Sequence, residues 1–130
     1  MTDEELIEAA TAARDKAYAR YSGYYVGAAL FDEQGATHVS CNVENAAYPL
    51  GSCAETGAIA AMVAAGGTRI RKIAIVGGAG EIAKCTPCGG CRQRIKEFAD
   101  GDTLIIMRND DGEWARYTID ELLPESFQLP

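Results

Sequence analysis

The residues best suited to chemistry are three cysteines and one carboxylate near the starts of two predicted helices. Cys53 precedes an alanine-rich apolar stretch, and Glu55 follows two positions later. Cys88 and Cys91 open the second helix. Because residues three apart share a face in a first helical turn, both of these sulfurs can reach one ion. Cys53 would then be its third ligand.

Three protein ligands with one open position are typical of catalytic zinc, because water in the fourth position has its pKa lowered to about 7. Two helix N-termini can offset the excess negative charge of three thiolates. A carboxylate beside the ion can take a proton from water and pass it to a substrate. Glu55 can do so only if Cys53 lies at the helix end, since positions i and i+2 of a regular helix point to nearly opposite sides.

The other cysteines leave alternatives open. Cys85 forms a second Cys-x-x-Cys with Cys88, which also allows a closed four-cysteine structural zinc site. A thioredoxin-like redox pair is a further alternative, although the expected strand and helix context is missing. Cys41 ends a predicted strand and is interpreted as a small buried hydrophobe. His38 stands alone and is interpreted as a strand or surface residue rather than a ligand.

These groups must be positioned by elements that alternate between helix and strand. The apolar spacing and turn residues predict, in chain order, a helix from 3 to about 20, a hairpin of strands 24–31 and 38–43, a helix 54–65, a strand 72–77, a helix 88–99, strands 103–107 and 114–118, and a short helix 119–123. This order predicts an α/β fold, a three-layer α-β-α sandwich around a mixed five-stranded sheet. We expect one domain over residues 1–130, because nothing resembles a linker or a repeat.

The helix predicted over 54–65 is apolar almost all round. Such a helix must be covered on every side, either by the sheet and a layer above it or by another subunit.

Composition limits the partners and the compartment. Nineteen Asp and Glu against twelve Lys and Arg give a net charge of −7, which would repel a phosphate backbone. We therefore expect no nucleic acid partner, although the tyrosines near the first hairpin also resemble a base-stacking platform. The start is acidic, and no apolar run is long enough to span a bilayer, so we expect a cytoplasmic protein without a membrane partner.

At these motifs the sequence resembles the cytidine deaminase family, whose signature pairs such cysteines with a proton-transferring Glu. The resemblance runs along the chain, and it is closest to the short, homotetrameric branch. The matching segments are Tyr21-Ser22, Val26 to Leu30, Asn42 to Ala46, Tyr48-Pro49, Cys53-Ala54-Glu55, Pro87 to Gln93 and Leu122 to Pro124.

The resemblance implies a role for each matching position. Cys53, Cys88 and Cys91 would bind one Zn²⁺ per subunit, and Glu55 would be the catalytic proton shuttle. The substrate-binding residues would be Tyr24 against the base, Asn42 and Glu44 on the ribose, Ala54 on the pyrimidine edge and Thr86 at the leaving amine. Neighbouring subunits would contribute Ala46, Tyr48 and Phe127.

The implied reaction is zinc-dependent hydrolytic deamination of cytidine and deoxycytidine to uridine and deoxyuridine plus ammonia, as in pyrimidine salvage. The alternative substrate is a modified cytidine or a cytosine nucleoside antibiotic such as blasticidin S. An editing deaminase would need a basic track for a nucleic acid strand, and a noncatalytic zinc scaffold would release no ammonia. Thr56 stands where many relatives have Arg, so we hypothesise a weaker acid at the metal, or compensation by Arg92 or Arg94.

Overall fold

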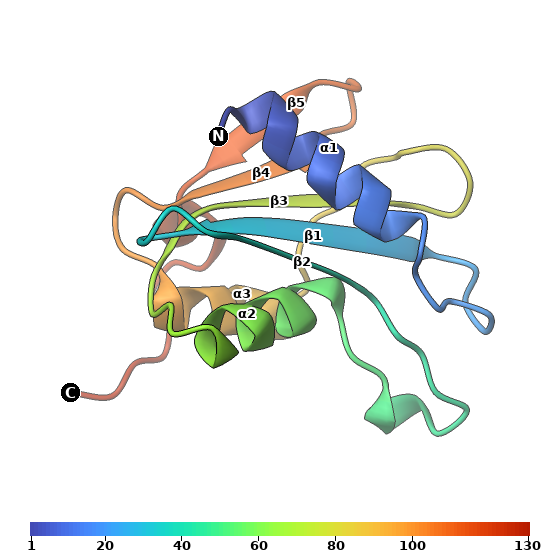
Figure 1. Ribbon diagram of the computed structural model, residues 1–130, viewed down its shortest axis with the longest axis horizontal. Helices are drawn as coiled ribbons and strands as arrows, with labels where there is room; N and C mark the ends of the chain where they lie inside the picture. The colour runs from blue at the N-terminus through green and yellow to red at the C-terminus, as the bar shows by residue number, and fades with distance from the viewer.

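A computed structural model describes residues 1–130. The chain forms one five-stranded sheet between two layers of helix (Figure 1). The helices are α1 (Asp3–Arg14), α2 (Ala54–Ala64), α3 (Gly89–Phe98) and α4 (Ile119–Leu122), with a 3-10 turn η1 (Tyr48–Leu50). The strands are β1 (Tyr25–Asp32), β2 (Thr37–Cys41), β3 (Ile70–Gly78), β4 (Leu104–Arg108) and β5 (Trp114–Tyr117).

The sheet is mixed, with strand order β2-β1-β3-β4-β5. Only β3 and β4 run parallel, and the connection between them contains α3. Helix α1 covers one face, while α2 and α3 lie side by side on the other (Figure 1). This arrangement confirms the predicted three-layer α-β-α sandwich with five strands.

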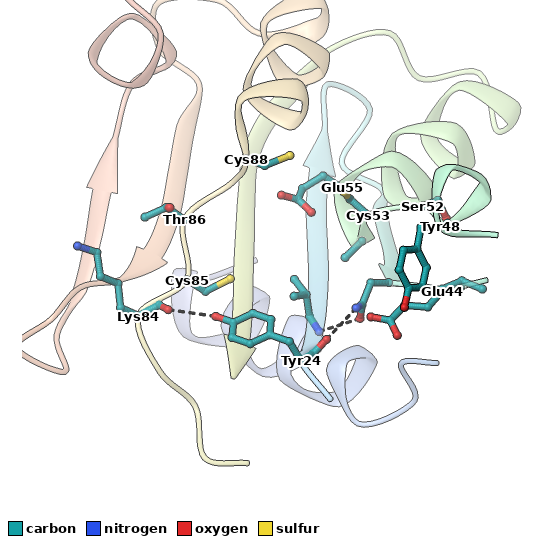
Figure 2. A pocket seen from close by; sticks show the side chains of 15 residues that line it. Tyr24, Glu44, Tyr48, Ser52, Cys53, Glu55, Lys84, Cys85, Thr86 and Cys88 are labelled. Carbon is teal, nitrogen blue, oxygen red and sulfur yellow. Dashed lines mark hydrogen bonds between the residues drawn. The ribbon is translucent and has the colours of Figure 1, made fainter. Parts of the chain in front are cut away.

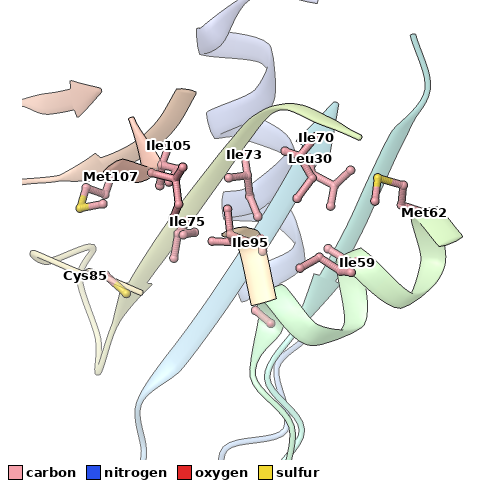
Figure 3. Close-up of a cluster of buried hydrophobic side chains, with 14 residues drawn as sticks. Leu30, Ile59, Met62, Ile70, Ile73, Ile75, Cys85, Ile95, Ile105 and Met107 are labelled. Carbon is pink, nitrogen blue, oxygen red and sulfur yellow. The ribbon is translucent and has the colours of Figure 1, made fainter. Parts of the chain in front are cut away.

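The central strands supply most of the core. Their apolar residues alternate between two clusters, one on each face of the sheet. On the α2 and α3 face, Ile73, Ile75 and Ile105 pack with Met62 and Ile95 (Figure 3). The apolar runs predicted to be interior strands are therefore buried by helices on both faces.

Helix α1 packs very closely on the opposite face. Leu6 and Ala10 are fully buried there. Gly27 of β1 faces this helix, and a Cβ at that position would overlap the backbone of Ala10 and Arg14. The close approach of α1 to the sheet therefore requires glycine at position 27.

The first helix was predicted to continue to about residue 20, and that boundary is wrong, because α1 ends at Arg14. The backbone of Tyr18 instead pairs with the segment that follows β2. Its N–H donates to the Asn42 carbonyl at 3.0 Å, and its carbonyl accepts from the Glu44 amide at 2.8 Å. Tertiary pairing therefore overrides the helical spacing of the sequence here.

The β1–β2 turn is organised around a buried carboxylate. Asp32 is 1% exposed, accepts hydrogen bonds from the amides of Gln34 and Ala36, and lies 2.9 Å from Nε2 of His38. Burial alone would raise the pKa of Asp32, but the hydrogen bonds from these amides and from His38 outweigh it and lower the pKa. His38 thus has a structural partner in the hairpin, in agreement with its interpretation as a strand residue.

Helix α2 is covered on one side only within this chain. Ala54, Ala58 and Met62 are buried against the sheet, whereas Ala60 and Val63 are exposed. The part of the apolar helix that faces away from the sheet therefore has no cover from its own chain. None of the helices has both the length and the apolar character needed to cross a membrane.

Candidate active site

Three sulfurs meet where the N-termini of α2 and α3 come together. Cys53 and Cys88 are the N-cap residues of these helices, both with extended backbone (ψ 157° and 167°), and Cys91 lies in the first turn of α3. All three Sγ atoms lie within 4.8 Å of one another. Cys53 thus lies outside the regular helix, which is the condition under which it and Glu55 can serve one site.

The donor set fits zinc. Sulfurs bonded to a tetrahedral zinc at about 2.3 Å stand about 3.8 Å apart, which three atoms within 4.8 Å can reach with little movement. Burial raises the pKa of the Cys53 and Cys91 thiols, while the Cys91 amide lowers the pKa of Cys88. Each thiolate also disfavours ionisation of the neighbouring thiols, because like charges repel. A bound divalent cation would stabilise all three thiols in the ionised form.

Glu55 lies beside the sulfurs at the floor of a pocket. It is in the first turn of α2, is 4% exposed, and lines the same pocket as Cys53 and Cys88 (Figure 2). Burial raises the pKa of Glu55, and its own amide, the Cys91 thiol and the Arg94 charge lower it in part. A buried carboxyl beside a cluster of metal-binding groups is a candidate for proton transfer to a bound ligand.

The pocket has a volume of about 560 Å³, which is within the usual range for a small-molecule site of ~300–1,000 Å³. Most of the predicted substrate-binding residues line it together with Glu55: Tyr24, Asn42, Glu44, Tyr48, Ala54 and Thr86. Residues from four separate segments therefore converge on one hollow above the sulfurs.

Asn42 and Glu44 form the polar side of this pocket. Asn42 Oδ1 accepts from the Val26 amide and its Nδ2 donates to the Tyr24 carbonyl, both at 2.9 Å. Glu44 accepts from the Tyr21 amide at 3.0 Å and from the amide and hydroxyl of Ser22. The Ser22 hydrogen bond, opposed by desolvation, lowers the pKa of Glu44. Each side chain is fixed by the backbone, and each still has hydrogen-bonding capacity for a ligand.

The opposite wall is built by Tyr24 and the segment before α3. The Tyr24 hydroxyl donates to the Lys84 carbonyl at 3.2 Å (Figure 2). Burial and the nearby Cys85 raise the pKa of Tyr24 to about 12, so the hydroxyl stays protonated. Lys84 and Cys85 also line the pocket and were not predicted as site residues. Their position directly before Thr86 in the sequence could have indicated that they also belong to the site.

Two predicted residues do not reach the pocket within this chain. Ala46 is exposed in the loop before η1, and Phe127 is 69% exposed in the C-terminal segment. The Phe127 carbonyl accepts from Nε2 of Gln93 at 3.0 Å, which holds this segment near α3. Tyr48 reaches the rim of the pocket but is 77% exposed.

The remaining cysteines stand apart from the sulfur cluster. Cys85 is buried in the pocket wall and does not belong to the group of three clustered sulfurs. Cys41 is half-buried at the end of β2. The structure therefore gives no geometric support to the closed four-cysteine site.

The chain matches known proteins over almost its whole length. A profile described as "Cytidine and deoxycytidylate deaminase zinc-binding region" matches residues 1–107. A cytidine deaminase of Sporosarcina psychrophila is 39% identical over 127 residues, which covers 98% of this chain and 92% of that protein.

Solved structures agree with these sequence matches. The crystal structure of cytidine deaminase from Burkholderia pseudomallei superposes with a TM-score of 0.88 at 42% identity, covering 98% of this chain and 100% of that one. The cytidine deaminase of Mycobacterium tuberculosis gives a TM-score of 0.84 at 35% identity, covering 99% and 100%. This chain, which carries three clustered cysteines, therefore belongs to the cytidine deaminase family, with its zinc-binding region.

Proposed function

We propose that this protein is a zinc-dependent hydrolase that deaminates cytidine and deoxycytidine to uridine and deoxyuridine with release of ammonia. The observation that carries this proposal is the buried Glu55 carboxyl beside three clustered sulfurs, at the floor of a pocket with a polar wall. Cytidine deaminase activity is supported by full-length relatives that bear this name.

Cys53, Cys88 and Cys91 would hold the zinc, which when bound supplies a water of lowered pKa and stabilises charge on its oxygen. Glu55 would take one proton from the attacking water and pass it to N3 of the pyrimidine, which makes C4 electrophilic as the water oxygen bonds to it. Glu55 would then take the remaining proton from the new C4 hydroxyl and deliver it to the exocyclic amine. The C4–N bond breaks, ammonia leaves, and the C4 carbonyl forms.

Other chain groups orient the base for these transfers. The Ala54 amide at the start of α2 is proposed to hold the pyrimidine edge together with Glu55. The Thr86 carbonyl is proposed to accept from the leaving amine, and Tyr24 packs against the ring. Because Glu55 is almost fully buried, bulk water has little access to its carboxyl group.

Asn42 and Glu44 are proposed to bind the sugar hydroxyls. Both side chains are already held by backbone hydrogen bonds, so a ligand meets them without ordering flexible groups. A ligand without sugar hydroxyls would leave this amide and carboxylate without hydrogen-bond partners, so it would bind much more weakly. A free nucleoside rather than a strand also suits a chain with a net charge of −7.

We further propose a single catalytic domain over residues 1–130 that assembles into a homotetramer. The uncovered side of α2 and the exposed rings of Tyr48 and Phe127 support contact with other copies. Ala46, Tyr48 and Phe127 would then complete pockets of neighbouring subunits. Sedimentation analysis tests this proposal, and a monomer that is fully active would contradict it.

Ultraviolet monitoring of cytidine conversion, with parallel ammonia measurement, tests the proposed reaction. We expect turnover of cytidine and deoxycytidine, loss of turnover after zinc is removed by a chelator, and recovery when zinc is returned. Blasticidin S is the comparison substrate. Faster turnover of blasticidin S than of either nucleoside would replace the proposed substrate, and no ammonia from any of the three would remove the enzymatic function.

A further inference from the structure

The proposed site gathers more negative charge than its metal can neutralise. Three thiolates alone carry three negative charges against the two positive charges of a zinc ion, and Glu55 adds a fourth whenever it is ionised. No ion pair of the structure includes Glu55. The amides at the helix N-termini offset part of this excess. A nearby cationic side chain would offset more of it.

Arg94 is the cation that contacts this cluster. Its Nη1 donates to Cys91 Sγ at 3.7 Å from one turn further along α3. Arg94 forms no ion pair with any carboxylate, so its charge is not already matched by an acidic partner.

The first turn of α3 leaves room for this guanidinium. A Cβ at Gly90 would stand 3.2 Å from Arg94 Nη1 and 4.0 Å from Cys88 Sγ. The guanidinium thus extends back over the turn that joins two of the three sulfurs. Glycine at position 90 lets it approach without a steric conflict, which links the Gly-Gly spacing between the two cysteines to the position of Arg94.

The other candidate cations are engaged elsewhere. Arg92 Nε donates to the Pro87 carbonyl at 2.9 Å, and its Nη1 donates to the Leu122 carbonyl at 2.7 Å. Lys84 pairs with Asp110 at 3.1 Å. Of Arg92 and Arg94, the structure therefore directs only Arg94 at a sulfur.

We propose that Arg94 is a positioning residue that holds the Cys91 thiolate through a charge-assisted hydrogen bond and thereby tightens zinc binding. This inference rests on the proposed function of the site. Thr56 and Arg94 line the same hollow of about 350 Å³ between α2 and α3, so α3 supplies from position 94 a charge that α2 lacks at position 56.

Mutating a residue that hydrogen-bonds to a metal ligand typically weakens metal affinity by about 10- to 100-fold. Arg94 is exposed, so solvent screens its charge, and we expect a value at the lower end. Replacing Arg94 by Met should therefore weaken zinc affinity by about 10-fold.

The test starts from zinc-loaded protein and measures zinc affinity by competition with a coloured chelator. The variants are Arg94→Met, Arg94→Gln and Arg94→Lys, with Lys96→Met as the matched control that removes a positive charge from the same helix. We expect about 10-fold weaker zinc binding for the Met and Gln variants. The Lys variant should keep most of the affinity, and the Lys96 variant should match the wild type.

Wild-type protein is measured first for zinc content and cytidine turnover, since a failure there overturns the proposed function rather than the role of Arg94. If the wild type is loaded and active but the Met and Gln variants bind zinc within twofold of it, the role of Arg94 is refuted. An equal loss in the Lys96 variant also refutes it, because any charge on α3 would then serve. Should the Met variant fail to fold, the Gln variant decides.

Discussion

Replacing Glu55 with Gln isolates proton transfer from every other property of the site. Gln has nearly the same size and keeps an acceptor oxygen, but it cannot take up and deliver the two protons of the proposed reaction. Each transfer by a positioned group is worth about 10²- to 10⁴-fold in rate. Because Glu55 is 4% exposed, bulk water is poorly placed to substitute for it. We therefore expect kcat/KM to fall by at least about 10⁴-fold, equivalent to about 5.5 kcal/mol of activation free energy.

The assay follows cytidine absorbance and released ammonia, and zinc content is measured on the same samples. Zinc should remain at one ion per chain, since the three sulfurs are unchanged. The Tm should not fall, because burial already disfavours the ionised form of Glu55. Glu113→Gln, in the exposed turn before β5, is the matched control and should keep full activity. Activity of the Glu55 variant within about tenfold of wild type would refute the proton-transfer role.

Three further outcomes follow from the geometry. Cys91→Ala should lose zinc and activity together, whereas Cys85→Ala should keep one zinc per chain by metal analysis; zinc loss from the second variant would restore the four-cysteine alternative. Asp32→Asn should cost about 2 kcal/mol in urea unfolding at pH 7. Because the folded pKa of Asp32 is lowered from 3.8, its contribution is present above about pH 4 and is lost as the pH falls further, so a difference that grows in acid would contradict this assignment. Gly27→Ala should lower the Tm strongly by overlapping the backbone of α1, while Gly101→Ala, with nothing within 4 Å, should not; equal Tm values would show that the helix can shift.

The sequence predicted the layers and the metal cluster because both depend on short-range patterns. Apolar runs and turn residues located both ends of all five strands to within two residues. The spacing of Cys88 and Cys91 in a first helical turn placed two sulfurs together without knowledge of the fold. The third sulfur, on Cys53, could be placed there only by the resemblance or by assuming that Cys53 directly precedes a helix. The structure confirms that position, because Cys53 is the N-cap residue of α2.

Local sequence patterns could not predict the contacts between segments that are distant in the chain. Tyr18 leaves the helical path because it pairs with the backbone after β2, a partner more than twenty residues away. The hydrogen bonds from Ser22 that hold Glu44 have the same long-range character. Residue spacing also could not show whether Arg92 or Arg94 contacts a sulfur. The direction of each side chain depends on the segments that pack around α3.

Placing the ligands at helix ends explains how one site can bind a cation and still keep an acid beside it. An N-cap residue has extended backbone, so the sulfurs of Cys53 and Cys88 project beyond their helices toward each other. Glu55 is then the second residue of α2. Its burial there raises its pKa, and its side chain still lines the pocket. On a regular helix the same two residues would diverge, and the carboxyl would lose either the metal or the substrate. The chemistry of the site therefore depends on where α2 begins, at Ala54, which is buried with Ala58 in the core on this face of the sheet.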